Sequence, residues 1–471
     1  MKKCPDEKDE HRKMAVIRAL PAMSGSRRRH LAARAGGPLL FPAAVTSAAF
    51  VWKRVDGGSG WGLSARKDNC QNSKNMPGEK ANRSVVQNRR NPMLTPESLI
   101  NQFAEECTAC GLCVDVCPIV AHTELKDAAP QTIMEDVLDL FRLGRIAALA
   151  RLRIYSCLFC NTCLSSCPRG LNPGLAFGTG KAVLQKLGDR PPKGVATIMS
   201  LGETLLESAI PAFRKRLDEP DRLITVIGNE KPAPVKTVLF ASCFGLIEGS
   251  VLHTTLKILE RIDPGVRILG GYDYCCGEFQ FMAGQPEAAH RQFAKLIAGL
   301  DALAPEQVVM FCPTCKMTFD HHHPDTNWSW TFITDFIADH LDKLGPLGEL
   351  NAAVTVHDPC HFVRGVTPAS DSPRRILKAI PGISVIEMKN TGDDALCCGA
   401  YAITGTGKPG YNFRDARLRQ AKETGADLLS LYCPGCQMVL GAEAQNIMPR
   451  VTSILSLLGR SLGIGGTSST P

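Results

Sequence analysis

Apolar positions in the second half of the chain predict short strands that alternate with helices. The predicted strands are residues 235–243, 266–269, 307–311, 353–356, 383–388 and 427–432. The predicted helices, in which apolar residues recur every three or four positions, are residues 251–262, 286–303, 373–380 and 414–424. Because the same order of elements occurs twice, we expect a duplicated α/β domain built from βα units.

The preceding region has the pattern of a helical domain. Apolar residues recur at helical spacing across residues 132–149, and a further helix is expected near residues 202–217. At the start of this domain Thr95 can cap a helix, Pro96 fits its first position and Glu97 suits its positive end. No apolar run reaches the roughly 18 to 20 residues of a membrane span.

These patterns divide the chain into successive segments. We expect a helical domain at residues 93–190 and a helical linker at 191–234. The two α/β repeats are expected at 235–345 and 346–460, and a flexible tail at 461–471. Residues 1–92 lack a helical or strand period, and we expect them to be a disordered or artefactual extension, with a targeting leader as the alternative.

The net charge of +8 has its origin in that first segment. Residues 1–92 hold 19 Lys and Arg against 7 Asp and Glu, so the rest of the chain is mildly acidic. A mildly acidic body gives no support to nucleic-acid binding.

Eighteen of the 20 cysteines fall into ordered sets, and only Cys4 and Cys70 are left over. Two sets share the pattern C-x2-C-x2-C-x3-C-P, and they are Cys107, Cys110, Cys113, Cys117 and Cys157, Cys160, Cys163, Cys167. Two longer sets share the pattern C…C-C-G…C-P-x-C, and they are Cys243, Cys275, Cys276, Cys312, Cys315 and Cys360, Cys397, Cys398, Cys433, Cys436.

The shorter sets predict two [4Fe–4S] cubane clusters. In such runs the first three cysteines bind one cluster and the fourth binds the other. The rule assigns one cluster to Cys107, Cys110, Cys113 and Cys167, and the other to Cys157, Cys160, Cys163 and Cys117. Zinc is the structural alternative, but zinc sites usually use two separated cysteine pairs. A disulfide framework belongs to short secreted chains, so we expect a reducing compartment.

In the longer sets, adjacent cysteines can hold two irons or bridge them, and Gly277 and Gly399 permit close approach of backbone. These sets resemble the duplicated cysteine-rich "CCG" domain of heterodisulfide reductase catalytic subunits. The segment H-D-P-C-H-x-x-R from His357 to Arg364 resembles the family's entry into its second repeat, as does A-K-E-T-G-A at residues 421–426. Related domains occur in the iron–sulfur subunits of glycolate oxidase, anaerobic glycerol-3-phosphate dehydrogenase and lactate-utilisation complexes.

The resemblance implies a helical two-[4Fe–4S] ferredoxin domain followed by a duplicated α/β cysteine-rich domain. It further implies one or two noncubane [4Fe–4S] clusters. Cys243, Cys275, Cys276, Cys312 and Cys315 are the expected ligands of one, and Cys360, Cys397, Cys398, Cys433 and Cys436 those of the other. In the reductases such clusters act on the sulfurs of a disulfide, so these ten cysteines are the candidate catalytic residues. Relatives that only conduct electrons often lack some of these cysteines, whereas this chain has all ten.

The expected function is that of an iron–sulfur oxidoreductase subunit of the heterodisulfide reductase type, which acts on a small disulfide or thiol. The alternative is an electron-relay subunit that serves a glycolate, lactate or glycerol-3-phosphate flavoprotein dehydrogenase. Because no flavin, haem or nicotinamide motif is found, electrons are expected to come through a partner, either a haem b membrane subunit or a flavoprotein. The resemblance implies a cytoplasmic protein held at the inner face of the membrane by that partner.

Three polar residues flank Cys360. His357 and His361 are expected to orient the loop by hydrogen bonds or to assist proton delivery, and Arg364 to stabilise cluster charge or to lie on the surface. The dinucleotide-like pattern Gly405-x-Gly407-x-x-Gly410 follows no clear strand and contains a proline, so we do not assign a nucleotide site to it.

Overall fold

The computed structural model describes residues 95–194, 207–225, 233–365, 367, 369–401, 408–443 and 449–464. These residues belong to one compact unit, Pro77–Pro471. The predictions for residues 1–92 and for most of the pattern from Gly405 to Gly410 lie outside the described residues. Within them, no helix has both the length and the apolar character needed to cross a bilayer.

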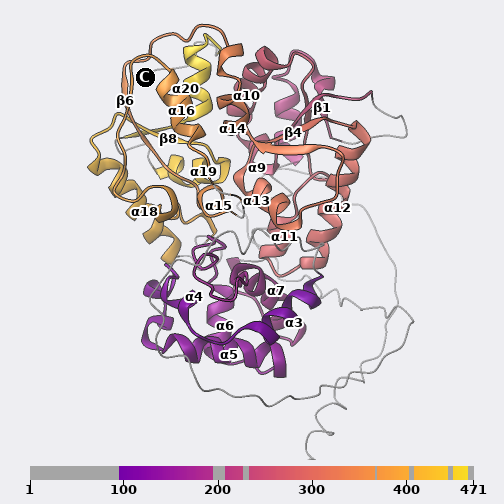
Figure 1. Cartoon of the computed structure of the whole chain (residues 1–471), viewed down its shortest axis with the longest axis vertical. Coiled ribbons are helices and arrows are strands. Elements are labelled where there is room, and N and C mark those ends of the chain that lie inside the picture. The colour runs from indigo at the N-terminus through magenta and orange to yellow at the C-terminus, as the bar shows by residue number, and fades with distance from the viewer. Residues whose placement is uncertain are drawn as a thin grey trace, which may run out of the picture. The chain divides into compact units, whose positions relative to one another are not determined.

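The N-terminal part is helical (Figure 1). Its helices are α3 (Pro96–Glu106), α4 (Leu112–Asp115), α5 (Pro130–Leu143), α6 (Ala148–Tyr155) and α7 (Pro173–Lys186), with 3-10 turns η2 (Val120–His122) and η3 (Glu124–Asp127). The predicted cap is confirmed, because Thr95 Oγ1 accepts a hydrogen bond of 3.1 Å from Ser98 N and Pro96 occupies the first turn. The core of this part includes Phe103, Val137 and Phe177.

The prediction of a single helix across residues 132–149 is wrong, because two helices occupy this segment. Gly144 adopts a left-handed conformation (φ +66°) and ends α5, and α6 begins four residues later. Glycine meets this conformation without the steric cost of a Cβ, and it caps helices for that reason. The break lets α6 pack back against α5.

The first α/β repeat is a parallel sheet with strand order β1-β3-β2-β4-β5. Its strands are β1 (Leu223–Ile224), β2 (Thr237–Phe240), β3 (Arg267–Leu269), β4 (Gln307–Met310) and β5 (Ser329–Phe332). Its helices are α9 (Cys243–Ile247), α10 (Gly249–Ile262), α11 (Glu278–Met282), α12 (Pro286–Leu303), α13 (Pro313–His322) and α14 (Ile333–Ala338), with 3-10 turns η4 (Pro220–Arg222) and η5 (Leu341–Lys343). The segment predicted as a helical linker thus contributes the edge strand β1.

The second repeat is also parallel, with strand order β7-β6-β8-β9. Its strands are β6 (Ala352–Val356), β7 (Ile383–Val385), β8 (Leu428–Leu431) and β9 (Arg450–Ser453). Its helices are α15 (Cys360–Val363), α16 (Ser372–Ala379), α18 (Lys408–Glu423), α19 (Pro434–Glu443) and α20 (Ile454–Ser461), with the 3-10 turn η6 (Gly392–Asp394). Thr237 pairs with Gln307 in the first sheet as Val354 pairs with Leu428 in the second, so the duplication extends to strand register.

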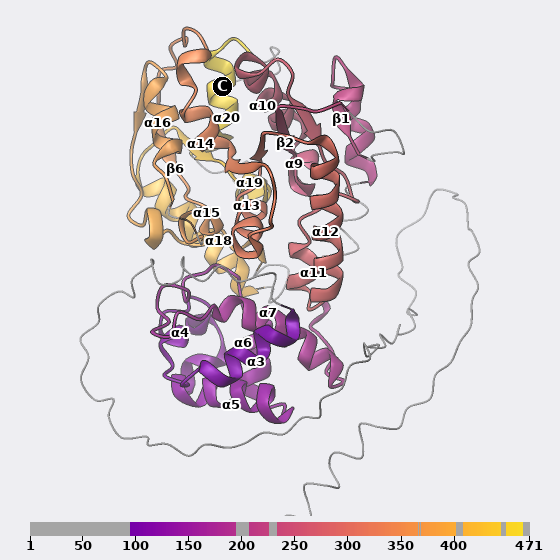
Figure 2. The same cartoon turned by 45° about the vertical axis from the view of Figure 1, so that its right-hand side comes forward.

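The two repeats share one apolar core. Helix α10 packs against α20 and α14 against α16, and Figure 2 shows α10 and α20 side by side. The rings of Phe332 and Phe362, one from each repeat, have centroids 5.0 Å apart. Because strands such as β2 and β8 are buried along their whole length, they appear in the sequence as mostly apolar runs without a polar residue at every second position.

Strand order determines where a site can form. In each sheet the chain passes from the central strand to a neighbour on one side and then crosses to the other side. In such sheets a crevice forms at the carboxyl ends of the two strands between which the direction of strand order reverses. The reversal lies between β2 and β4 in the first repeat and between β6 and β8 in the second. Cys243 and Cys312 follow the first two strands, and Cys360 and Cys433 follow the other two.

The glycine after each cysteine pair lies against the next long helix. Gly277 (φ +82°) and Gly399 (φ +83°) are both left-handed. A Cβ would lie 2.5 Å from the carbonyl oxygen of Ala289 in the first case and 2.3 Å from that of Gly410 in the second. The expected close approach of backbone is therefore present at both glycines.

We predict that Gly399→Ala destabilises the protein more than Gly425→Ala does. Gly425 is also left-handed (φ +68°) but has nothing within 4 Å of its Cβ position, so its replacement costs only the conformational strain of about 1–2 kcal/mol. Gly399→Ala adds overpacking of about 1–3 kcal/mol. Anaerobic urea unfolding measures both, and equal losses of unfolding free energy would contradict the role of the close contact.

Candidate metal centres

The first cysteine run surrounds helix α4. Cys107 follows α3 as its C-cap residue, and Cys113 lies within α4. Cys167, from the second run, lies with this group, because its charge acts on the thiols of both Cys107 and Cys113. Burial raises the pKa of Cys113 to about 12; the neighbouring thiols, including Cys110, add to the rise and Arg153 opposes it.

The second run gathers around Cys163. The charges of Cys157, Cys117 and Cys160 all act on the thiol of Cys163, whose pKa is raised mainly by burial. Burial also raises the pKa of Cys160 to about 11. Cys117 thus lies with the second run, and each run contributes its fourth cysteine to the other group.

A buried arginine lies between the two groups. Arg153 of α6 is 1% exposed, and its guanidinium stacks 4.1 Å from the ring centroid of Phe177. Its Nε and Nη1 atoms have no hydrogen-bond partner among the described residues. Burial lowers the pKa of Arg153, but the thiolates around it outweigh burial and raise that pKa above its usual value; they are Cys117, Cys157, Cys163 and Cys113, so both groups are represented. A buried cation with free donors requires an anion, and a thiolate-bound cluster is one.

The five cysteines of the first repeat converge above β2 and β4. Cys243 begins α9, and Cys312 is the N-cap residue of α13. The Sγ atoms of Cys276 and Cys315 are 3.5 Å apart. Hydrogen bonds from the thiols of Cys243 and Cys276 lower the pKa of Cys275 well below its usual value.

The second repeat has the same arrangement. Cys360 begins α15 after β6, and Cys436 lies in the first turn of α19. Cys397 Sγ accepts a hydrogen bond of 3.3 Å from Gly399 N. Hydrogen bonds from the thiols of Cys360 and Cys398 lower the pKa of Cys397 well below its usual value, and that backbone donor adds to the effect.

The two sets of five meet at Cys312 and Cys433. The pKa of Cys312 is lowered by hydrogen bonds from Cys315 and from Cys433, which belongs to the other repeat. Thr314 lies beside this contact, with its hydroxyl 2.8 Å from His361 Nδ1 and 3.5 Å from the Tyr401 hydroxyl. Both repeats therefore contribute thiols and hydroxyl groups to one place.

The helical domain directly contacts the five cysteines of the second repeat, here called the second set. Cys160, Cys360 and Cys397 belong to one buried cluster, against which Cys117 packs. The charge of Cys397 acts on the thiol of Cys160. The second group of four thiols and the second set of five are thus neighbours.

His361 and Arg364, which follow Cys360, hold the helical domain against the second repeat. His361 Nε2 lies 2.7 Å from the carbonyl oxygen of Phe159, which can only accept, so Nε2 carries the proton and Nδ1 accepts from Thr314. Arg364 is 8% exposed and donates through Nε to the Cys160 carbonyl oxygen at 2.8 Å and through Nη1 to the Ala395 carbonyl oxygen at 2.9 Å. His361 orients the loop as expected, and the surface alternative for Arg364 is wrong.

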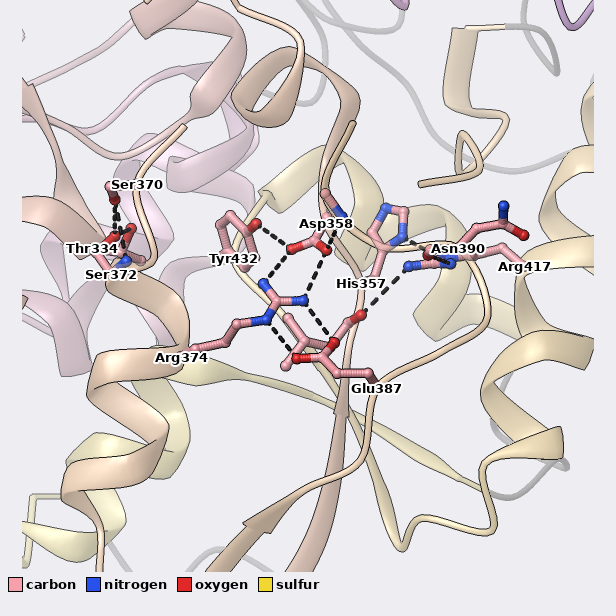
Figure 3. A network of polar contacts seen from close by, with 12 residues as sticks. Thr334, His357, Asp358, Ser370, Ser372, Arg374, Glu387, Asn390, Arg417 and Tyr432 are labelled. Carbon is pink, nitrogen blue, oxygen red and sulfur yellow. Dashed lines mark hydrogen bonds and ion pairs between the residues drawn. The ribbon is translucent and has the colours of Figure 1, made fainter. Parts of the chain in front are cut away.

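A polar network surrounds His357 and Asp358, which precede Cys360 in the chain (Figure 3). Asp358 forms a bidentate pair with Arg374 at 2.8 and 2.9 Å and accepts a hydrogen bond of 2.9 Å from Tyr432. Burial raises the pKa of Asp358, but Arg374, Gly392 N and Tyr432 together hold it below the usual value. His357 is fully buried, and its Nδ1 lies 2.9 Å from Arg417 Nε. Burial and the charge of Arg417 lower the pKa of His357 to about 3.

Sequence reasoning missed Arg153, Arg417 and Thr314. Arg153 lies in the segment predicted as one helix and Arg417 in a predicted helix, where an arginine is ordinarily solvated. Helical spacing offered one signal that Arg153 is buried, because Arg153 occupies the face of α6 that also carries the buried residues Ala150 and Ile154.

The donor set fits iron–sulfur chemistry. The eighteen cysteines of the described residues are free thiols in four gathered groups. Burial raises the pKa of many of them, so a thiolate at such a position depends on a cation such as a metal centre. His357, Cys398 and Cys436 also place one ligand-type atom each within 4.8 Å of one another.

Comparison with known proteins identifies the domains in which these cysteines lie. The 4Fe-4S dicluster domain matches residues 103–171, and the cysteine-rich (CCG) domain matches twice, at residues 237–320 and 354–441. A component of the dihydromethanophenazine:CoB–CoM heterodisulfide reductase of Methanosarcina acetivorans is 25% identical over 403 residues, which cover 76% of this chain and 94% of that protein. The probable glycolate oxidase iron–sulfur subunit of Bacillus subtilis is 22% identical over 440 residues, covering 78% and 95%.

A third relative is a component of the fumarate reductase (CoM/CoB) of Methanothermobacter marburgensis, 24% identical over 351 residues, which cover 70% of this chain and 66% of that protein. The chain is therefore an iron–sulfur oxidoreductase in which a 4Fe-4S dicluster domain precedes two cysteine-rich CCG domains, and it is homologous to that heterodisulfide reductase component and to the glycolate oxidase iron–sulfur subunit.

Proposed function

We propose that this chain is the catalytic subunit of a complex of the heterodisulfide reductase type. The reaction takes a small disulfide, two electrons and two protons, breaks the S–S bond and releases two thiols. The observation that carries the proposal is the meeting of two complete five-cysteine sets at Cys312 and Cys433. Thiol sets that meet in this way would hold two neighbouring clusters, which would suit a substrate with two adjacent sulfur atoms.

The proposed ligands follow the four gathered groups. One cubane is assigned to Cys107, Cys110, Cys113 and Cys167, and the other to Cys157, Cys160, Cys163 and Cys117. One noncubane cluster is assigned to Cys243, Cys275, Cys276, Cys312 and Cys315, and the other to Cys360, Cys397, Cys398, Cys433 and Cys436. When bound, these clusters supply single electrons to the disulfide.

The chain's own residues exclude water from the site and hold the domains against each other. The cysteines of the two repeats, apart from Cys243, are buried, which keeps water from the site. His361 and Arg364 hold the loop of Cys160 against the second set, so the helical domain and the α/β repeats keep a short, fixed separation for electron transfer. Thr314 and Tyr401 place hydroxyl groups where the two sets meet.

The second candidate function is electron relay beside a flavoprotein dehydrogenase. Similarity to the probable glycolate oxidase iron–sulfur subunit over 78% of this chain favours it. Electrons would then pass from a flavoprotein through this chain to a quinone pool. Under either function we propose a partner, a haem b membrane protein or a flavoprotein, which holds the chain at the inner face of the membrane.

Anaerobically isolated protein is predicted to contain about 16 irons, four for each of four clusters. Iron and acid-labile sulfide analysis measures this directly. A content near eight irons would remove the noncubane assignment, and a content dominated by zinc would remove all four clusters.

Cys397→Ser is predicted to reduce disulfide reductase activity at least about hundredfold, because removal of one member of a catalytic unit removes most of the rate. Both cubanes should remain, since their proposed ligands lie in the other domain. The assay follows oxidation of reduced methyl viologen by a panel of small disulfides, with Cys70→Ser as the control outside every set. If wild-type protein reduces no disulfide but passes electrons from a flavoprotein to a quinone analogue, the relay function is correct.

Arg153→Met is predicted to lower the reduction potentials of both cubanes. A buried positive charge stabilises the more negative, reduced state, so its loss should shift each potential by at least about 59 mV, a tenfold change in the equilibrium constant for one electron. The control is Arg151→Met on the same helix, because Arg151 is 40% exposed and pairs with Asp189 at 2.8 Å. Potentiometric titration followed by electron paramagnetic resonance should show no shift in the control.

A further inference from the structure

The two repeats differ at the residues that follow their central strands. Counting back from Cys243 and Cys360, Phe240 occupies the position of His357 and Ala241 that of Asp358. The equivalence holds in three dimensions, because the central strands β2 and β6 pair in matching register with β4 and β8. The duplicated backbone therefore carries an apolar pair in one repeat and a polar pair in the other.

The apolar pair packs among aromatic rings. Phe240 is fully buried, and its ring centroid lies 6.4 Å from that of Phe319, which in turn contacts Phe293 at 4.9 Å. Phenylalanine offers no hydrogen-bond donor at this position. The first set of cysteines therefore receives no side-chain donor from the position equivalent to His357.

The contact with Arg417 determines which ring nitrogen of His357 carries the proton. Every nitrogen of an arginine side chain donates and none accepts. Arg417 Nε faces His357 Nδ1 at 2.9 Å, so Nδ1 must be the acceptor and the ring proton must be on Nε2. Arg417 is itself held by the carbonyl oxygen of Asn390 at 2.7 Å and the side chain of Gln420 at 2.9 Å, and these two contacts fix its orientation.

The donor on Nε2 is buried and has no partner among the described residues. A ring nitrogen of His357 and the Sγ atoms of Cys398 and Cys436 lie within 4.8 Å of one another. Because Nδ1 is occupied by Arg417, the nitrogen free to interact with sulfur is Nε2. A protonated Nε2 cannot ligate a metal, but it can donate to a thiolate or sulfide.

We propose that His357 is a positioning residue that donates a hydrogen bond from Nε2 to sulfur of the cluster in the second repeat, so that this cluster has the higher reduction potential of the two. The inference rests on the proposed function only in that a cluster is bound at this set. A donor to sulfur stabilises the more negative, reduced state, and the first repeat, with Phe240, lacks that donor. The second set also adjoins Cys160 of the helical domain, so the cluster that accepts electrons first is the one nearest their source.

The test compares the potentials of the two repeats. Signals of each cluster are assigned by their loss in Cys275→Ser and in Cys397→Ser, and midpoint potentials are then read by potentiometric titration with electron paramagnetic resonance. His357→Phe, which copies the first repeat, should lower the equilibrium constant for reduction of the second cluster about tenfold, equal to about 59 mV for one electron. His357→Gln, which retains an N–H donor, should recover most of the shift, and the first cluster and both cubanes should not move.

Histidine labelled with ¹⁵N in the ring gives a second test, in which the coupling of His357 must be lost in His357→Phe, because His361 also lies beside the second set. A weak ¹⁵N coupling at the second cluster is expected for a hydrogen-bonded histidine. Absence of coupling, a strong coupling from a directly bound nitrogen, or equal potentials in wild type and His357→Phe would each overturn the inference. Absence of cluster signals from the second repeat, with about eight irons in the protein, would instead refute the proposed cluster content. Retained clusters with the predicted shift but no disulfide reduction would refute only the proposed catalytic function.

Discussion

Negative sulfur in an apolar interior is the constraint on which the rest of this structure depends. A buried thiolate without a cation is unstable, and burial accordingly raises the pKa of thiols such as Cys113 and Cys163. Around the gathered thiols the chain places groups that favour negative charge. They include the guanidinium of Arg153, the backbone N–H of Gly399 and the first turns of α13 and α19.

The parallel sheets explain how ten cysteines from distant parts of the chain meet. Each repeat returns to its strand ends where strand order reverses, and there Cys312 from one repeat contacts Cys433 from the other. The shared core formed by α10, α14, α16 and α20 fixes the repeats against each other. A site made from two copies of one fold would thereby suit the proposed disulfide substrate, which has two reacting atoms.

Duplication did not leave the two copies chemically equal. The first repeat packs Phe240 and Phe319 behind its cysteines, while the second holds Asp358, Arg374 and Tyr432 in a polar network with His357 beside it (Figure 3). The helical domain contacts the second repeat through Arg364 and His361. The polar network and Cys160 of the helical domain therefore adjoin the same copy, while helix α7 of that domain also contacts α11 of the first repeat.

The sequence by itself determined the elements whose signals are local. Helix α12 matches the predicted residues 286–303, strand β4 lies within the predicted 307–311, and Thr95 caps α3, because helical spacing, apolar runs and capping chemistry are all properties of neighbouring residues. Cysteine spacing likewise indicated four metal-binding groups, since the two repeated cysteine patterns can be recognised along the chain. Local patterns did not reveal the break at Gly144 or the short strands β1, β5 and β9, whose stability comes from partners far away in the chain.

Only the tertiary structure decided which groups surround each set of thiols. Arg153 lies in a predicted helical segment and Arg417 in a predicted helix, where arginine is ordinarily solvated, and burial alone gives each its role. The tautomer of His357 follows from Arg417, sixty positions away, and the place of Arg364 follows from Cys160 in another domain. Hydrogen-bond donors act over about 3 Å, so their effect depends on which segments the fold brings together and cannot be read from their order in the chain.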